Sequence, residues 1–253
     1  MARVPGGSEP ATGRHRDLEH AETAWGRSTP QSLLTVGDLR KAAGRLPLAL
    51  ALAGRAVRDP RTFGITAVAI RRHRALQKPL ELFEYLRFLR GRHTVRCLEI
   101  GSLWGGTFFA HCAVTSPSGH VMAVDAFPDE SGDVMAARFR RLARGTQRVT
   151  CIWRDSHAKA TVSEVARALD GQPLDVLFLD GDHSSEGAAR DYEMYAPLVR
   201  PGGVIALHDI DSTSEGSGMP MLWRSLRDRH ESVEFIDRVH PPHGLGIGAI
   251  VKG

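Results

Sequence analysis

The 253-residue sequence is poor in the features that mark secreted, membrane-spanning and zinc-binding proteins. Its cysteines are odd in number and lack the spacing of a zinc site, which favours free thiols in a reducing cytosol. The longest apolar run, residues 46–54, is far shorter than the roughly 20 residues that a membrane span needs. The N-terminus has no apolar core typical of a signal peptide, so we expect a cytoplasmic protein without a membrane span.

Aromatic residues are also scarce, at 6% of the chain, and positive charge is concentrated in one region. Residues 1–94 hold 17 Lys and Arg against 8 Asp and Glu, whereas residues 95–253 are net acidic. Such a basic segment could contact RNA, a membrane surface or an acidic partner. However, no aromatic residues are interleaved with the arginines, as stacking on bases would require. We therefore favour a solvated helical face over nucleic-acid binding.

The sequence divides into three parts. Residues 1–31 are polar, contain Gly and Pro and show no periodicity, which predicts a disordered or loosely attached tail. In residues 32–92, apolar residues recur at three- and four-residue steps, which predicts helices with breaks at Pro60 and Pro79. From residue 93 to residue 253, short β-rich runs alternate with helical ones and predict a separate domain.

This alternation predicts an α/β fold, a Rossmann-like doubly wound sheet of seven mostly parallel strands with helices on both faces. We expect strands at 95–100, 120–127, 148–155, 174–181, 203–210, 233–237 and 247–252, and helices near 105–115, 132–144, 159–169, 186–197 and 219–229. In such a sheet, ligands bind where the strand order reverses, at the carboxyl ends of the strands. The residues that follow each strand are therefore the candidates for function.

Residues typical of a nucleotide site follow the first three strands. Gly101 and Gly105 form a glycine-rich turn before a helix, although the spacing is not that of the dinucleotide fingerprint. Asp125, 24 residues beyond Gly101, is placed to accept both hydroxyls of a ribose, or alternatively to cap the next helix. Asp155 and Ser156 could contact an adenine edge, although Asp-Ser is also ordinary capping chemistry.

Carboxylates and imidazoles follow the fourth and fifth strands. Asp180 and His183 come after one strand, and His208 and Asp209 after the next. Parallel strands deliver these side chains to the same edge of the sheet, and together they suit a divalent ion such as Mg²⁺ or Mn²⁺. The alternative is structural, with Asp180 and Asp209 capping helices and His208 buried in the core. The coincidence of both groups at matching strand ends favours function.

These stretches resemble class I S-adenosylmethionine-dependent methyltransferases. The resemblance covers roughly residues 95–253 and rests on "LEIGSLWGGT", "VMAVDAF", "GLGIGAIVKG" and above all the "DGDH…D…PGG…HD" run within 180–209. Within that fold the sequence is similar to metal-dependent O-methyltransferases, both of the catechol type and of the type that acts on macrolide sugars and other natural products. In such enzymes a helical segment before the core often supports substrate binding or oligomer contacts, so the resemblance allows a homo-oligomer.

The resemblance implies roles for individual residues. Asp180, His208 and Asp209 would bind the metal, with His208 standing where an acidic residue or Asn is usual, and His183 would be the general base. With the residues described above, the predicted S-adenosylmethionine contacts are Glu99, Gly101, Ser102, Gly105, Thr107, Asp125, Asp155, Ser156 and Asp180.

The sequence thus predicts an S-adenosylmethionine-dependent O-methyltransferase, assisted by a divalent metal, that acts on a small-molecule hydroxyl. One alternative is a metal-independent methyltransferase with His183 or His208 as the base. Others are a nucleic-acid-modifying methyltransferase that uses the basic N-terminal region, and a binding protein or nicotinamide enzyme on the same sheet. The identity of the methyl acceptor is not encoded in any recognisable motif.

Overall fold

The computed structural model describes residues 50–126, 132–238 and 245–253, all within one compact unit, residues 45–253. The predicted tail of residues 1–31 lies outside the described residues. A helix covers residues 50–58 and precedes the named elements. These are α3 (Pro60–His73), α4 (Pro79–Arg90), β1 (Arg96–Ile100), α5 (Gly106–Val114), β2 (His120–Asp125), α6 (Gly132–Arg140), β3 (Arg148–Trp153), α7 (Lys159–Leu169), β4 (Leu174–Leu179), α8 (Ser185–Tyr195), a 3-10 turn (Ala196–Leu198), β5 (Val199–His208), α9 (Met219–Arg227), β6 (Glu231–Phe235) and β7 (Ile247–Val251). None of the helices described in these ranges is long and apolar enough to cross a membrane.

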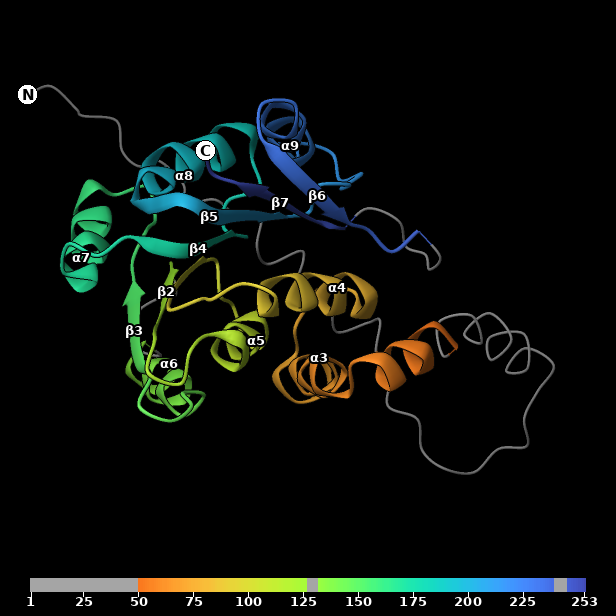
Figure 1. Cartoon of the computed structure of the whole chain (residues 1–253). Coiled ribbons are helices and arrows are strands. Elements are labelled where there is room, and N and C mark those ends of the chain that lie inside the picture. Colours follow the sequence, from red (N-terminus) through yellow and green to blue (C-terminus); the bar gives the residue numbers. More distant parts are fainter. Residues whose placement is uncertain (1–49, 127–131, 239–244) are drawn as a thin grey trace, which may run out of the picture. The chain divides into compact units, whose positions relative to one another are not determined.

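The seven strands form one sheet in the order β3-β2-β1-β4-β5-β7-β6 (Figure 1). Strands β1 to β5 are parallel to one another, and β7 runs antiparallel to both β5 and β6. The predicted doubly wound, mostly parallel sheet is therefore confirmed. The strand order reverses between β1 and β4, so the loops that follow these two strands meet at the switch point where such sheets bind ligands.

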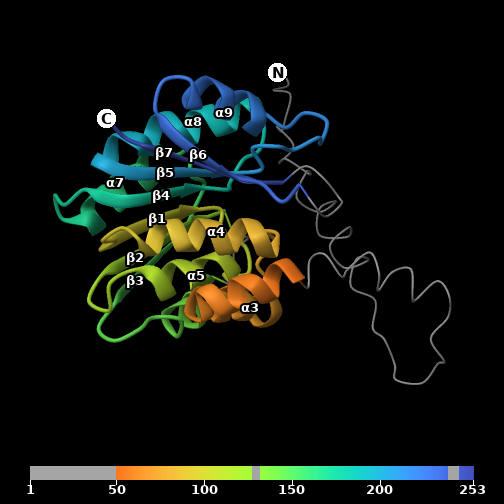
Figure 2. The same cartoon turned by 45° about the vertical axis from the view of Figure 1, so that its right-hand side comes forward.

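Helices cover both faces of the sheet (Figure 2). Leu98 and Ile100 of β1 point into the core under α7, α8 and α9. Cys97, one residue out of phase with them, points into the core under α3, α4, α5 and α6. Because successive side chains of a strand alternate between faces, one short strand serves two apolar cores.

The helices before the sheet belong to the second of these cores. Leu82, Tyr85, Leu86 and Leu89 of α4 are fully buried, and α3 and α4 both contact α5. Both helices begin at a proline, as the sequence predicts, because proline has no amide hydrogen to place at a first turn. The predicted domain boundary at residue 92 stays a prediction. In the structure, α3 and α4 contribute buried side chains to the same core as the sheet.

One strand begins earlier than its sequence indicates. Strand β5 starts at Val199, four residues before the predicted range, and runs through a Pro-Gly-Gly sequence. Its pairing with β4 shifts register between Leu174 and Val176. Such an irregularity lets a strand continue past residues that disfavour pairing.

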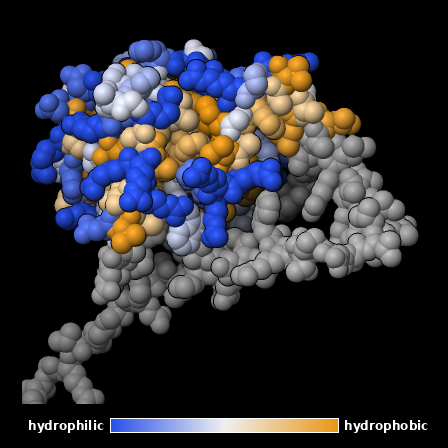
Figure 3. Space-filling view, turned by 90° about the horizontal axis from the view of Figure 1, so that it is seen from below, coloured by the Kyte–Doolittle hydropathy of each residue, from blue (hydrophilic) through white to orange (hydrophobic). Residues whose placement is uncertain are grey.

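Hydrophobic side chains also reach the surface near the start of the described chain. Leu50, Val57, Val68 and Leu76 are exposed large hydrophobic residues in the helical segment before the sheet. Figure 3 shows hydrophobic patches among hydrophilic residues on the face seen from below.

Candidate active site

The glycine-rich turn joins β1 to α5 at the switch point. Gly101 has a φ of +80°, and a side chain there would overlap the carbonyl group of Asp180. The Gly101 amide donates to the Val124 carbonyl at 2.9 Å, and the Asp180 amide donates to the Ile100 carbonyl at 2.9 Å. Glycine is thus required because the ends of β1, β2 and β4 come together here, which brings the predicted cofactor loop against Asp180.

Asp125, at the end of β2, braces this turn. Its Oδ2 accepts hydrogen bonds from the backbone amides of Ser102 at 2.7 Å and Leu103 at 2.8 Å. Leu103 has a positive φ of 43°, a costly conformation for a residue with a side chain, so the two bonds stabilise an unfavourable turn. The carboxylate therefore organises the loop itself, and its predicted contact with a ribose stays a prediction.

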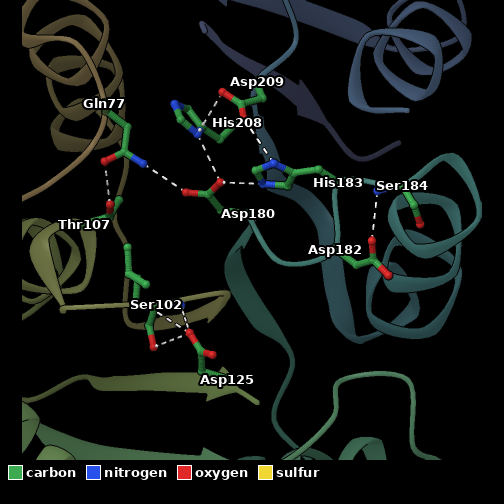
Figure 4. A network of polar contacts seen from close by, with 11 residues as sticks. Gln77, Ser102, Thr107, Asp125, Asp180, Asp182, His183, Ser184, His208 and Asp209 are labelled. Carbon is green, nitrogen blue, oxygen red and sulfur yellow. Dashed lines mark hydrogen bonds and ion pairs between the residues drawn. The ribbon is translucent and has the colours of Figure 1, made fainter. Parts of the chain in front are cut away.

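Four ionisable side chains converge beyond the ends of β4 and β5 (Figure 4). Oδ1 of Asp180 lies 3.2 Å from Nε2 of His183 and 3.0 Å from Nδ1 of His208. The carboxylate of Asp209 lies 3.2 Å from Nδ1 of His183 and 3.3 Å from Nδ1 of His208. We call Asp180, His183, His208 and Asp209 the strand-end cluster. The structure thus brings together the three predicted metal ligands and the predicted base.

The members of the strand-end cluster differ in exposure. The side chain of His183 is 38% exposed, whereas that of His208 is 4% exposed. Asp180 and Asp209 lie between these values, at 15% and 13%. The His183 carbonyl accepts the Gly218 amide at 2.7 Å, which ties its loop to the segment before α9. His183 is therefore the imidazole that a substrate can reach.

Burial and charge set the protonation states of the cluster. For Asp180 and His208, burial opposes the charged form, but the opposite charges around each group outweigh that effect. The carboxylates of Asp180 and Asp209 raise the pKa of His208 to about 10 against burial, which alone would lower it. The imidazoles of His208 and His183 hold the pKa of Asp180 at about 2 against burial, which alone would raise it. His208 is thus a fixed positive charge at neutral pH.

The pKa of His183 is also raised. Burial lowers it, but the hydrogen bond to Asp180 and the charges of Asp180 and Asp209 outweigh burial, while His208 opposes them. The pKa of this partly exposed imidazole therefore lies above its ordinary value.

The donor atoms of the strand-end cluster can be compared with what the predicted divalent metal requires. Its oxygen and nitrogen donors are suitable in type, and two buried atoms, Nε2 of His208 and Oδ1 of Asp209, have no hydrogen-bond partner. However, Nδ1 of His208 forms ion pairs with the carboxylates of both Asp180 and Asp209. This nitrogen therefore occupies the position that a metal ion bound between the two carboxylates would need. In the described ranges, no group of three or more His, Cys, Asp or Glu is arranged to hold a metal ion. The arrangement present does not fit the metal.

The sequence did not point to Gln77, which lies between α3 and α4 and is only 3% exposed. Its Nε2 donates to Oδ2 of Asp180 at 3.0 Å, and its Oε1 accepts the hydroxyl of Thr107 at 2.7 Å (Figure 4). The distance of 103 residues between Gln77 and Asp180 leaves no local pattern to detect.

Two other sets of predicted cofactor residues lie in different surroundings. Asp155 accepts the His157 amide at 2.8 Å within a local turn, whereas the Ser156 carbonyl accepts the hydroxyl of Tyr195 at 2.8 Å, which ties the turn to α8. Glu99 is buried on the face covered by α4 and α5, with its Oε2 2.7 Å from Nδ1 of His111. The roles of these residues toward a cofactor stay predictions.

Known proteins resemble this chain in sequence and in fold. Residues 98–210 match the family model described as a methyltransferase domain. A curated relative from Sinorhizobium fredii, the uncharacterized protein y4gI, is 25% identical over 158 residues. These residues make up 60% of this chain, and the match spans 17% of the relative's length.

The structure is also similar to solved methyltransferases. The O-methyltransferase TomG of tomaymycin synthesis from Streptomyces achromogenes, solved with S-adenosylmethionine, has a TM-score of 0.50 at 19% identity, over 76% of this chain and 90% of that one. MycE of the mycinamycin pathway, solved with Mg, S-adenosylhomocysteine and mycinamycin VI, has a TM-score of 0.52 at 20% identity, over 90% and 66%. An rRNA methylase from Streptococcus thermophilus has a TM-score of 0.51 at 9% identity, over 70% and 98%. The predicted fold and the resemblance to S-adenosylmethionine-dependent methyltransferases are confirmed.

Proposed function

We propose that this chain, whose residues 98–210 match a methyltransferase domain, transfers the methyl group of S-adenosylmethionine to a hydroxyl of a small molecule. One observation carries the proposal. At the switch point of the sheet, beside the glycine-rich turn, stands a partly exposed imidazole, His183, held between two carboxylates. This is the arrangement of a positioned base next to the place where such sheets bind nucleotides.

The reaction would be a displacement at the methyl carbon. A lone pair on the acceptor oxygen forms the new C–O bond while the C–S bond breaks, and the bonding pair leaves with sulfur as S-adenosylhomocysteine. One ring nitrogen of His183 gives up its contact with a carboxylate and takes the acceptor's proton. The other ring nitrogen stays on a carboxylate, which fixes the ring, and the rate depends on holding the acceptor oxygen in line and close.

Exposure and charge favour one of the two histidines considered as the base. His208 is 4% exposed and has its pKa raised to about 10, so it keeps its proton at neutral pH and has little access to an acceptor. His183 is 38% exposed. We assign His183 as the base and His208 as the positive charge that balances Asp180 and Asp209.

The base must be unprotonated to act. Because the pKa of His183 is raised above the ordinary histidine value of 6.5, the rate should increase with pH through a midpoint above that value. A rate that is independent of pH between 6 and about 9 would contradict the assignment.

The divalent metal predicted from the sequence enters no step of this mechanism, because the cluster as arranged does not fit an ion. Methyl transfer from labelled S-adenosylmethionine to a panel of hydroxylated small molecules tests the proposal directly. We expect transfer in excess chelator at the rate seen without it, and no increase on adding Mg²⁺ or Mn²⁺. Loss of transfer in chelator and its recovery with metal would restore the metal-assisted mechanism.

A nucleic-acid substrate is the second candidate. It is favoured by exposed Arg71, Arg72 and Arg74 at the end of α3 and by the similarity in fold to an rRNA methylase. Ribosomal RNA therefore belongs in the acceptor panel. Transfer to RNA that falls steeply with salt would support this candidate, because phosphate contacts weaken as salt rises.

A further inference from the structure

The link between α3 and α4, residues 74–78, is packed against the start of α5. Helix α3 ends at His73, and the capping residue Arg74 adopts a left-handed conformation with a φ of 58°. The next residue, Ala75, then lies so close to Gly106 that a side chain on Gly106 would overlap its backbone. The link therefore lies against the N-terminus of α5, which follows the glycine-rich turn and is part of the predicted cofactor site.

Gln77 extends from this link into the strand-end cluster. It is 3% exposed, so its amide makes its bonds away from competing water. The Thr107 hydroxyl donates to Oε1 at 2.7 Å, and Nε2 donates to Oδ2 of Asp180 at 3.0 Å. The reverse orientation of the amide would place its oxygen against a carboxylate oxygen, so the network itself defines which end faces Asp180.

This contact divides the two oxygens of Asp180 between different partners. Gln77 holds Oδ2, and Oδ1 is left facing the ring nitrogens of His183 and His208. A carboxylate without the amide on Oδ2 could rotate and change both imidazole contacts together. Gln77 thus links the first turn of α5, through one side chain, to the orientation of the histidine that we assign as the base.

We infer that Gln77 is a positioning residue for methyl transfer, which acts through Asp180 on the orientation of His183. The expected effect of Gln77 on the rate rests on the proposed function. The hydrogen bond that links Gln77 to Asp180 does not depend on it. Since a shift of about 1 Å in a reacting group costs up to about 100-fold in rate, loss of this contact should slow turnover.

Gln77→Leu keeps a similar volume and removes both polar ends. We expect kcat to fall by about 10- to 100-fold, while the dissociation constant of S-adenosylmethionine measured by calorimetry changes by less than about threefold. Thr107→Val, compared at saturating cofactor because Thr107 is also a predicted cofactor contact, should lower kcat less, because it keeps the bond between Gln77 and Asp180 and removes the one that orients the amide. Combining the two should cost no more than Gln77→Leu alone, since both changes break one chain of contacts.

Gln147→Leu is the matched control. Gln147 is also buried, and its Nε2 donates to the carbonyls of Cys112, Thr115 and Ser116 at the opposite end of α5. Its loss should reduce thermal stability and leave kcat of the folded enzyme within about twofold. Equal losses of kcat in the two leucine variants would mean that Gln77 has only a structural role and would overturn the inference.

A second readout separates this inference from the proposed function. If the wild-type chain transfers no methyl group to any acceptor, the proposed function fails, and the ¹⁵N NMR signals of the His183 and His208 rings test Gln77 alone. We expect Gln77→Leu to shift both sets of signals and Gln147→Leu to shift neither. Unchanged ring signals in a folded Gln77→Leu variant would overturn the inference whatever the activity.

Discussion

Two groups in this fold combine a carboxylate with an imidazole, and they differ in how far solvent reaches them. The strand-end cluster lies at the carboxyl edge of the sheet, with His183 38% exposed. The other group, which we call the interior group, consists of Glu99 on β1, His111 on α5 and Tyr85 on α4. Its three side chains are at most 1% exposed.

The interior group forms a continuous chain of contacts. Oε2 of Glu99 lies 2.7 Å from Nδ1 of His111, and Nε2 of His111 lies 3.0 Å from the hydroxyl of Tyr85. Burial raises the pKa of Glu99, against the effect of His111, and raises that of Tyr85 as well. The three side chains are buried and bonded to one another, so this group joins two helices to the sheet away from solvent.

From this comparison we propose that position along a strand, and not the type of side chain, separates groups that act on a substrate from groups that stabilise the fold. Glu99 precedes the last residue of β1 and points under α5, whereas Asp180 follows the last residue of β4 and lies in the loop. The interior group should therefore control stability, and the strand-end cluster should control activity.

The largest expected effect is on turnover. His183→Ala should lower the rate of methyl transfer by about 10²- to 10⁴-fold, the usual contribution of a positioned base. His111→Ala, measured at a temperature where it is folded, should retain the wild-type rate within a few-fold. Labelled-methyl assays with saturating cofactor measure both. Full activity in His183→Ala would remove the base and with it the distinction between the two groups.

The next largest expected effect is on stability, and here the interior group should matter more than the strand-end cluster. His111→Ala should lower the free energy of unfolding by about 3–5 kcal/mol, because it leaves the buried Glu99 carboxyl without its partner. Urea unfolding followed by circular dichroism gives this value. Glu84→Gln is the control, since Glu84 pairs with Arg55 and Arg87 at the surface, where such pairs contribute about 1 kcal/mol or less. A loss in His111→Ala no larger than in the control would show that the interior group is not what joins the helices to the sheet.

The shifted pKa values of the strand-end cluster should make the stability of the protein depend on pH. The pKa of His208 is raised from 6.5 to about 10, so its contribution is fully present below pH 6.5 and is lost as pH rises through about 10. The pKa of Asp180 is lowered from 3.8 to about 2, so its contribution is present above pH 3.8 and is lost as pH falls through about 2. Melting temperature measured against pH should decline above pH 6.5 in the wild type, and His208→Gln should flatten that decline. An NMR titration of the His208 ring with a midpoint near 6.5 would contradict this expectation, even if the variant does not fold.

The smallest expected effect concerns Asp125, a carboxylate outside both groups. Asp125→Ala removes the acceptor for the Ser102 and Leu103 amides and the predicted ribose contact. We expect the affinity for S-adenosylmethionine to fall by about tenfold, as for the loss of one charged hydrogen bond. Asp125→Asn keeps an oxygen acceptor and should retain most of the affinity. Unchanged affinity in a folded Asp125→Ala variant would mean that cofactor binding needs neither the hydrogen bonds from Asp125 to the loop nor the predicted ribose contact.

The sheet, its helices and the residues at the strand ends were predictable from sequence because their signals are local. Apolar runs mark the strands, and the side chains at or just past their ends, such as His208 and Asp180, lie at the ligand-binding edge of any parallel sheet. The start of β5 was not predictable, because its pairing with β4 outweighs the local preference of Pro and Gly.

By itself, the sequence determined the fold class and which side chains stand at the strand ends. Only the tertiary structure decided how those side chains are used. It showed that Glu99 faces His111 in the interior, that His208 is locked between two carboxylates, and that Gln77 from the preceding helices holds Asp180. The physical reason is that protonation, exposure and orientation depend on groups far apart in the chain, which only packing brings within hydrogen-bonding distance.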